Sequence, residues 1–152
     1  MGAALLCKED VALTTFMIGV WVSFRNKKTG ILTMIISLVW FFLCMKVFLP
    51  FFNDEGFFRF QGGYWFSTFW HNKFELSYYW ETFAQARVGR YAWQLGLPLL
   101  FLFLGTSLLA AAALPGFMVN VLSSNDYLIS IYYHYNFQVL PMLFAASAMS
   151  FS

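Results

Sequence analysis

Long apolar blocks separated by short polar clusters dominate the pattern of this chain. The clearest block is "GILTMIISLVWFFLCMKVFLPFF" at 30–52, and ~20 apolar residues match the hydrocarbon thickness of a bilayer. A second helix is predicted over 2–24, provided that the charged "KED" is tolerated within it. Arg25, Lys27 and Lys28 lie between these two blocks. We therefore expect a helical hairpin whose basic tip faces the cytoplasm, as the positive-inside rule requires.

Residues 53–90 combine many aromatic side chains with scattered charges. This mixture is favoured in the headgroup zone of a membrane. Leu76, Tyr79, Trp80 and Phe83 recur at helical spacing, and the polar residues mostly take other faces. The pattern predicts an outer loop that contains an interfacial helix near 74–88.

The segment from residue 91 to 125 contains no charged side chain. Such a run is long for one upright helix and short for two. We expect a short helical hairpin over 91–122 with its break near "LGTS". A second outer loop over 123–137 and a final helix over 138–152 would follow. Whether the uncharged run crosses the membrane once or twice stays open.

The amino-acid composition indicates that these apolar helices belong to an integral membrane protein. Of 152 residues, 61% are hydrophobic and only 11% are charged, whereas a soluble domain carries roughly 25% charged residues. We therefore expect an all-α integral membrane protein, one domain over 1–152, with about four or five transmembrane or half-spanning helices and an aromatic-rich interfacial segment. The net charge of +2 comes without a basic stripe, which argues against nucleic acid as a partner.

Four ionisable residues fall inside the predicted hairpin: Lys8, Glu9, Asp10 and Lys46. Each costs ~2.5 to 3.5 kcal/mol at such depth unless it is paired or faces water. At a rise of ~1.5 Å per residue from the tip, Asp10 and Lys46 lie at similar heights and should approach each other. Three roles stay open: snorkelling to the outer interface, a functional pair that lines a polar cavity, and a salt bridge that locks the helices.

His134 lies among tyrosines in "SIYYHY". A neutral imidazole can accept a proton or bind a metal or pigment at a pH where lysine and aspartate do not titrate. The tyrosines fit an interfacial aromatic belt equally well, so anchoring is the alternative role. Cys7 and Cys44 lack metal-ligand spacing, and no soluble-enzyme motif occurs, so the sequence predicts no metal site and indicates no cofactor.

Five sequence elements together resemble a known family: "KED", "FLPFF", "LGLPLLFLFLG", "LPGFMVNVLSS" and "SIYYHY". The family comprises prokaryotic polytopic membrane proteins of unknown function and is similar to the GT-C glycosyltransferases, which use polyprenyl-phosphate-linked sugars. The resemblance covers nearly the whole chain and implies a multi-pass protein of the prokaryotic cytoplasmic (inner) membrane. It favours Lys8, Glu9, Asp10 and His134 as catalytic residues. The candidate substrate-binding residues are Lys46, Arg59, Tyr133 and Tyr135.

One departure from the GT-C pattern leaves two functions open. The acidic catalytic and metal-binding residues of that superfamily lie in the first outer loop, and this sequence begins after such a region. The chain is then expected to be a transferase segment, catalytically incomplete on its own, whose partner protein supplies the missing helices. The alternative is a small non-catalytic subunit of a photosynthetic or respiratory membrane complex, packed against lipids, pigments or partner helices. The sequence does not indicate the sugar donor or acceptor.

Overall fold

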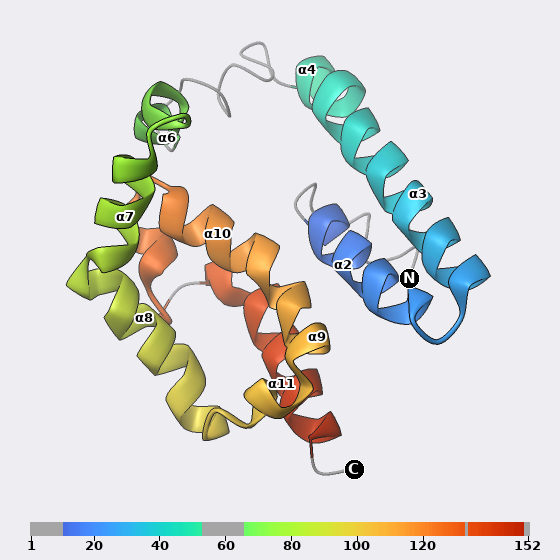
Figure 1. Cartoon of the computed structure of the whole chain (residues 1–152). Coiled ribbons are helices and arrows are strands. Elements are labelled where there is room, and N and C mark those ends of the chain that lie inside the picture. Colours follow the sequence, from blue (N-terminus) through green and yellow to red (C-terminus); the bar gives the residue numbers. More distant parts are fainter. Residues whose placement is uncertain (1–10, 53–65, 133, 151–152) are drawn as a thin grey trace.

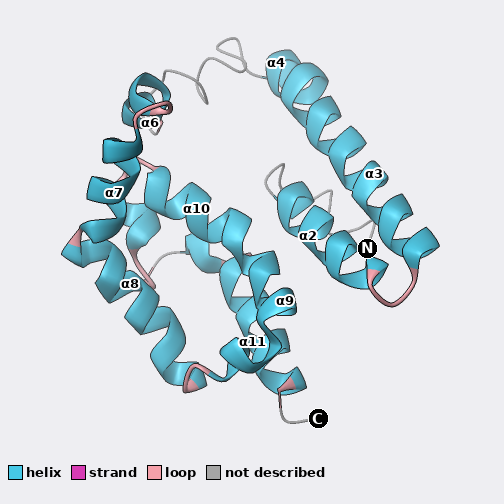
Figure 2. Ribbon diagram, viewed as in Figure 1, coloured by secondary structure: helices cyan, strands magenta, loops and turns pink. Residues whose placement is uncertain are grey.

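Helices account for the regular structure of this protein. The computed structural model describes residues 11–52, 66–132 and 134–150, and over these ranges the chain forms α-helices, 3-10 helices and a π-helix, without a strand. Short loops join the helices, as Figure 2 shows. The all-α class expected from the sequence is confirmed for this part of the chain.

The first two described helices form an antiparallel hairpin, α2 (Val11–Ser23) and α3 (Lys27–Leu43) (Figure 1). Asn26 caps α3, because its side-chain oxygen accepts a hydrogen bond from the Thr29 amide at 3.2 Å. This cap explains why α3 begins three residues before the start at 30 that hydrophobicity alone predicts. An ideal Cβ on Gly30 would lie 2.4 Å from Cα of Ser23, so the two backbones touch at this crossing.

Helix α3 continues without a break into the π-helix η1 (Cys44–Phe48) and then α4 (Leu49–Phe52). Lys27–Phe48 is the one helix in the described ranges that is long and apolar enough to cross a membrane. Its 22 residues span about 33 Å at a rise of ~1.5 Å per residue. Much of its apolar surface is exposed, which distinguishes it from the core helix of a soluble protein; examples are Ile31, Leu32, Ile35, Val39 and Phe42.

Three further apolar helices are shorter, with 10–17 residues each: Val11–Ser23, Leu108–Leu122 and Val139–Met149. A straight helix of this length is too short for a ~30 Å hydrocarbon core. The described residues therefore contain one full-length candidate span, and the expected total of four or five spanning or half-spanning helices is not established.

Three helices follow the gap at 53–65: α6 (Ser67–Asn72), α7 (Leu76–Ala84) and α8 (Ala86–Gly96). The single helix expected near 74–88 is thus wrong, since Gln85 adopts an extended conformation between α7 and α8. The hydrophobic spacing explains the break. Apolar residues recur every three or four positions within each helix, but five positions separate Phe83 from Val88. The two apolar faces therefore point in different directions, and a break lets each face its own surroundings.

The chain reverses after α8, at Leu100 and Phe101. A short 3-10 helix, η2 (Leu97–Leu99), ends there, and both residues have positive φ, 48° and 56°. The Phe101 amide donates to the Gly96 carbonyl at 3.1 Å, and the Leu100 amide donates to the Leu97 carbonyl at 3.0 Å. This is the Schellman pattern of helix termination, with leucine where glycine is usual. The break expected at "LGTS" is wrong, because η3 (Leu102–Thr106) begins before that sequence and continues into it.

Short helical pieces lead from this reversal to the end of the described chain. They are α9 (Ser107–Ala110), η4 (Ala111–Ala113), α10 (Leu114–Leu122), η5 (Asp126–Ile129), η6 (His134–Asn136) and α11 (Val139–Met149). Pro115 lies in the first turn of α10, where the missing amide hydrogen costs nothing. The expected outer loop over 123–137 thus contains two 3-10 turns.

The hydrophobic core lies between α8, α10 and α11. Side chains of α8 at positions 88, 91 and 95 form a buried stripe at helical spacing, which Leu99 of η2 extends. The stripe packs against Ala113, Val121, Val139 and Leu143. Helix α2 joins this core through contacts with α10 and η4, so the hairpin packs on the same body.

Candidate functional site

A buried polar network lies at the centre of this otherwise apolar core. The Tyr91 hydroxyl donates a hydrogen bond to Oδ1 of Asn136 at 2.5 Å and accepts one from Nδ2 of Asn120 at 2.8 Å. At most 3% of the surface of each residue is exposed. Each bond contributes about 1 kcal/mol net, whereas a buried group left without its partner costs ~1 to 3 kcal/mol. The three residues therefore depend on one another.

The same two amides hold both ends of the "SIYYHY" segment, residues 130–135. Nδ2 of Asn136 donates to the Ser130 carbonyl at 2.7 Å, and Nδ2 of Asn120 reaches the Tyr135 carbonyl at 3.4 Å. On its other side, the Tyr91 ring stacks on Phe117 of α10, with centroids 5.5 Å apart. Tyr91 of α8, Asn120 of α10 and Asn136 of η6 thus hold the two ends of this segment.

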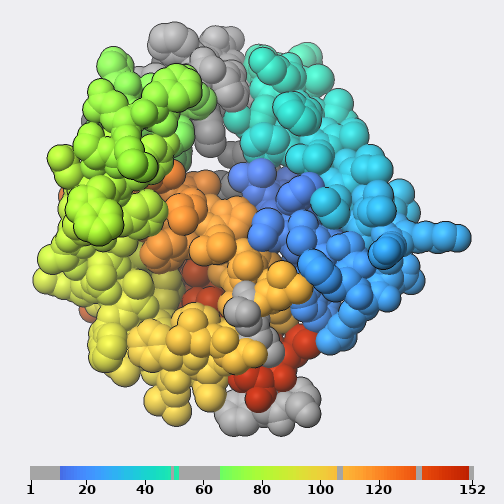
Figure 3. Space-filling model, viewed as in Figure 1, coloured from blue at the N-terminus to red at the C-terminus, as the bar shows by residue number. Residues whose placement is uncertain are grey.

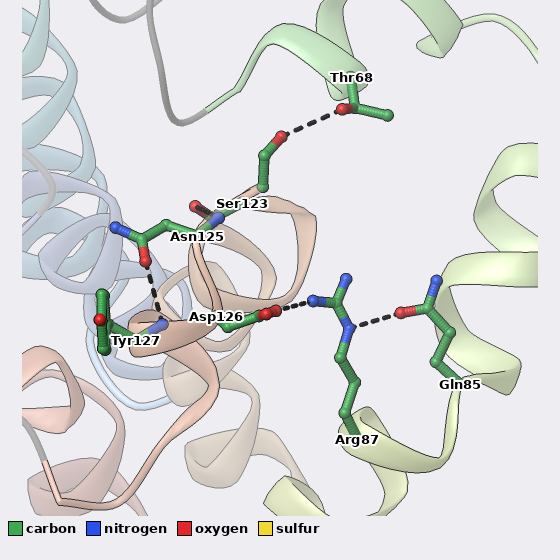
Figure 4. A network of polar contacts seen from close by, with 8 residues as sticks. Thr68, Gln85, Arg87, Ser123, Asn125, Asp126 and Tyr127 are labelled. Atoms are coloured by element: carbon green, nitrogen blue, oxygen red, sulfur yellow. Dashed lines mark hydrogen bonds and ion pairs between the residues drawn. The ribbon is translucent and has the colours of Figure 1, made fainter.

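A second set of polar contacts lies where α6 and α8 meet residues 123–127 (Figure 4). Arg87 forms an ion pair with Asp126 and also donates from Nε to the Gln85 side chain. The Ser124 hydroxyl donates to the Thr68 hydroxyl at 3.1 Å. These groups are exposed, and an exposed ion pair adds only ~0 to 1 kcal/mol. These contacts therefore orient α6 and α8 relative to residues 123–127, but they add little to the stability of the fold.

Gln138 connects the hairpin to the same region. Its buried side chain accepts a hydrogen bond from the Thr14 hydroxyl of α2 at 3.3 Å. A Cβ on Gly116 of α10 would lie 3.2 Å from Gln138, so a larger residue there would press against it. The first turn of α2 and the residue that precedes α11 are therefore in contact.

Helix α7 presents an exposed apolar face formed by Leu76, Trp80 and Phe83. The Lys73 ammonium, which precedes the helix, lies 4.6 Å from the centre of the Trp70 ring and 5.2 Å from that of Phe74. Such cation and aromatic pairs suit the zone between lipid and water. Burial raises the pKa of the Tyr78 hydroxyl.

The residues singled out from the sequence have different outcomes. Lys8, Glu9, Asp10, Arg59 and Tyr133 lie outside the described residues. The backbone of His134 begins η6, and the carbonyl of Tyr135 in the same turn belongs to the buried network. Lys46 lies in η1 with an exposed side chain, on the hairpin formed by α2 and α3. The expected approach of Lys46 to Glu9 and Asp10 therefore stays a prediction.

Sequence reasoning missed the three residues that hold the "SIYYHY" segment: Tyr91, Asn120 and Asn136. Asn120 could have been identified from the sequence, because a single amide side chain inside the apolar stretch "LPGFMVNVL" needs a buried hydrogen-bond partner. Its partners could not be read, since Tyr91 lies 29 residues before it. In the described ranges, no three His, Cys, Asp or Glu side chains gather as metal ligands.

An exposed apolar helix of bilayer length in an all-helical chain is typical of an all-α membrane protein. The chain belongs to the family described as "Predicted membrane protein (DUF2079)", whose model matches residues 3–152. No curated protein and no solved structure matches it. The expected membership of a membrane-protein family of unknown function is confirmed.

Proposed function

We propose that this chain is the membrane segment of a GT-C-type transferase that binds a polyprenyl-phosphate-linked sugar at the outer face of the prokaryotic cytoplasmic membrane. The observation that carries the proposal is the hydrogen bond between Thr14 and Gln138. It supports a common site for the two most polar elements of the family resemblance, "KED" and "SIYYHY", which lie far apart in the sequence.

Chain length supports the convergence of these two elements. Asp10 precedes Thr14 by four residues, and His134 precedes Gln138 by four. Four residues reach at most ~14 Å when fully extended, so chain length would let Asp10 and His134 each lie within about that distance of the Thr14–Gln138 contact. We propose that Lys8, Glu9 and Asp10 adjoin His134 and Tyr135 in one polar site.

The packing register of the hairpin supports adding Lys46 to that site. Ser23 lies opposite Gly30, and four residues further along both helices Gly19 lies opposite Met34. Lys46 is twelve residues beyond Met34, so on the helix predicted over 2–24 its level would correspond to the position twelve before Gly19, next to Lys8. The ammonium groups would bind the lipid phosphate, because a phosphate near the membrane surface attracts basic side chains.

The remaining candidate residues take complementary roles in this proposal. Arg59 and Tyr133 would contact the headgroup from the outer loops, while Glu9, Asp10 and His134 would accept or deliver protons during transfer. Histidine suits this role because its unperturbed pKa lies near neutrality. The shorter apolar helices would complete a multi-pass topology as partial spans, with Arg25, Lys27 and Lys28 in the cytoplasm.

Photo-crosslinking to a polyprenyl phosphate that carries a diazirine near its phosphate tests the binding site. In membranes that contain the full-length protein, Lys46→Ala should reduce crosslinking at least fivefold. Lys28→Ala is the matched control, since it removes the same charge from the other end of the continuous helix Lys27–Phe48 and should leave crosslinking unchanged. Equal crosslinking of both variants and the native protein would contradict the proposed site.

A second function, a non-catalytic subunit of a larger membrane complex, is favoured by the exposed apolar surface of α3. Side chains such as Phe42, Val39 and Leu32 suit partner helices or pigments as well as lipid. Native purification in mild detergent followed by mass spectrometry separates the two functions. A subunit should co-migrate at fixed stoichiometry with photosynthetic or respiratory proteins, whereas a transferase segment should co-migrate with a chain that supplies further transferase helices.

A further inference from the structure

A groove of about 320 Å³ opens between α8, η4, α10 and α11. Ala92 and Leu95 of α8 form one wall, Phe117 of α10 forms part of the opposite wall, and Val139 and Leu143 of α11 also line it. Figure 3 shows a recess between α8 and α10 with red atoms of α11 deep inside it. Alanine, leucine, valine and phenylalanine make up its whole lining. The groove therefore offers its occupant dispersion contacts but no side-chain hydrogen bond.

We propose that this groove binds one acyl chain of a membrane phospholipid. The carbon-only lining matches the chemistry of a flexible hydrocarbon chain, which needs no polar partner.

The apolar residues at the opening of the groove support the bilayer as the source of that acyl chain. Leu104 and Leu114 line the groove and are themselves 65% and 47% exposed. The neighbouring Leu108 is also exposed. The apolar lining thus continues onto an apolar outer surface, and an acyl chain can enter without passing a charged group. Bilayer phospholipid is the most concentrated hydrocarbon around a membrane protein of this family.

The bound acyl chain would also contact Phe117, the side chain that packs against the buried polar network. Phe117 lines the groove and stacks on Tyr91, whose hydroxyl group binds Asn120 and Asn136. Lipid in the groove would therefore hold Phe117 in place and help to fix the segment at 130–135. This role does not depend on the proposed transferase function.

Native mass spectrometry of the full-length protein from phosphatidylglycerol nanodiscs tests the proposal. The native protein should retain one phospholipid after transfer to detergent. Ala92→Phe should lower the retained fraction at least tenfold, because the new ring occupies the groove from an exposed position on α8. Ala86→Phe is the matched control, as Ala86 is exposed on the same helix outside the groove, and it should retain lipid like the native protein.

Two results would overturn the proposal. One is equal retention by Ala92→Phe, Ala86→Phe and the native protein. The other is retention of added polyprenyl phosphate in place of phosphatidylglycerol, which would make an isoprenoid chain the occupant. Far-UV circular dichroism of both variants shows whether they fold. If Ala92→Phe is unfolded, Leu104→Asn at the mouth replaces it, and undiminished retention by that variant overturns the proposal equally.

Discussion

Tyr91 is the residue on which the buried network depends. Its hydroxyl group is both a donor, to Asn136, and an acceptor, from Asn120. No other residue type of similar size supplies both functions in one atom at the end of an aromatic ring. The ring itself fills core volume between α8 and α10, so the residue joins packing to polar pairing.

Tyr91→Phe should lower the free energy of unfolding by about 1 to 3 kcal/mol, because it keeps the ring but removes the hydroxyl that pairs with Oδ1 of Asn136 and Nδ2 of Asn120. Titration with SDS in mild detergent, followed by far-UV circular dichroism, measures this loss. Tyr132→Phe is the control, since Tyr132 is 86% exposed. A change for Tyr91→Phe no larger than for Tyr132→Phe would show that the network does not stabilise the fold.

Leu100 is strained where the chain reverses. Its φ of 48° lies in the left-handed region, which costs a residue with a Cβ ~1 to 2 kcal/mol. Its side chain is 74% exposed and recovers little of that cost through burial.

Leu100→Gly should therefore raise the free energy of unfolding by about 1 kcal/mol, because glycine adopts this conformation freely. The same SDS titration measures the gain. Leu97→Gly, in the ordinary helical region just before it, should instead destabilise the protein. Destabilisation by both substitutions would argue against a left-handed residue at position 100.

At the scale of elements, some helix boundaries can be predicted from the sequence and others cannot. The helix that begins at Lys27 follows from its continuous apolar run, and only its capped start needed the structure. The break at Gln85 could be read from the five-residue step between Phe83 and Val88. The reversal at Leu100 could not, since leucine gives no local sign of a left-handed conformation. The pairing of Tyr91 with Asn136 depends on tertiary packing, which hydrophobic spacing does not encode.

The crossing of α2 and α3 depends on Gly19 and Gly30. At Gly30 an added methyl group would meet the Ser23 backbone, which cannot move aside as a flexible side chain can. At Gly89 of α8, by contrast, an added Cβ has no neighbour within 4 Å.

Gly30→Ala should destabilise the protein by about 1 to 3 kcal/mol through this overlap. Gly89→Ala should stabilise it by about 0.5 to 1 kcal/mol through higher helix propensity. SDS titration of the two variants, which differ from the native protein by the same methyl group, gives the comparison. Equal effects of the same sign would mean that the hairpin does not pack closely at Gly30.

The whole molecule combines a hairpin that contains the candidate spanning helix with a body built on α8, α10 and α11. In Figure 1 the hairpin tip and α4 lie at opposite ends of α3. The loop at 123–126 contacts α6, which follows α4 and the segment after it. A membrane crossed by α3 would therefore separate the basic tip from the face to which we assign ligand binding.

Labelling with a membrane-impermeant maleimide in intact cells tests this separation most directly. Lys27→Cys and Ser124→Cys would each be introduced into a chain in which Cys7 and Cys44 are replaced by serine. The account predicts that Ser124→Cys reacts in intact cells, whereas Lys27→Cys reacts only after the membrane is permeabilised. Reaction of Lys27→Cys in intact cells, or equal reaction of both before permeabilisation, would contradict the topology on which the proposed site depends.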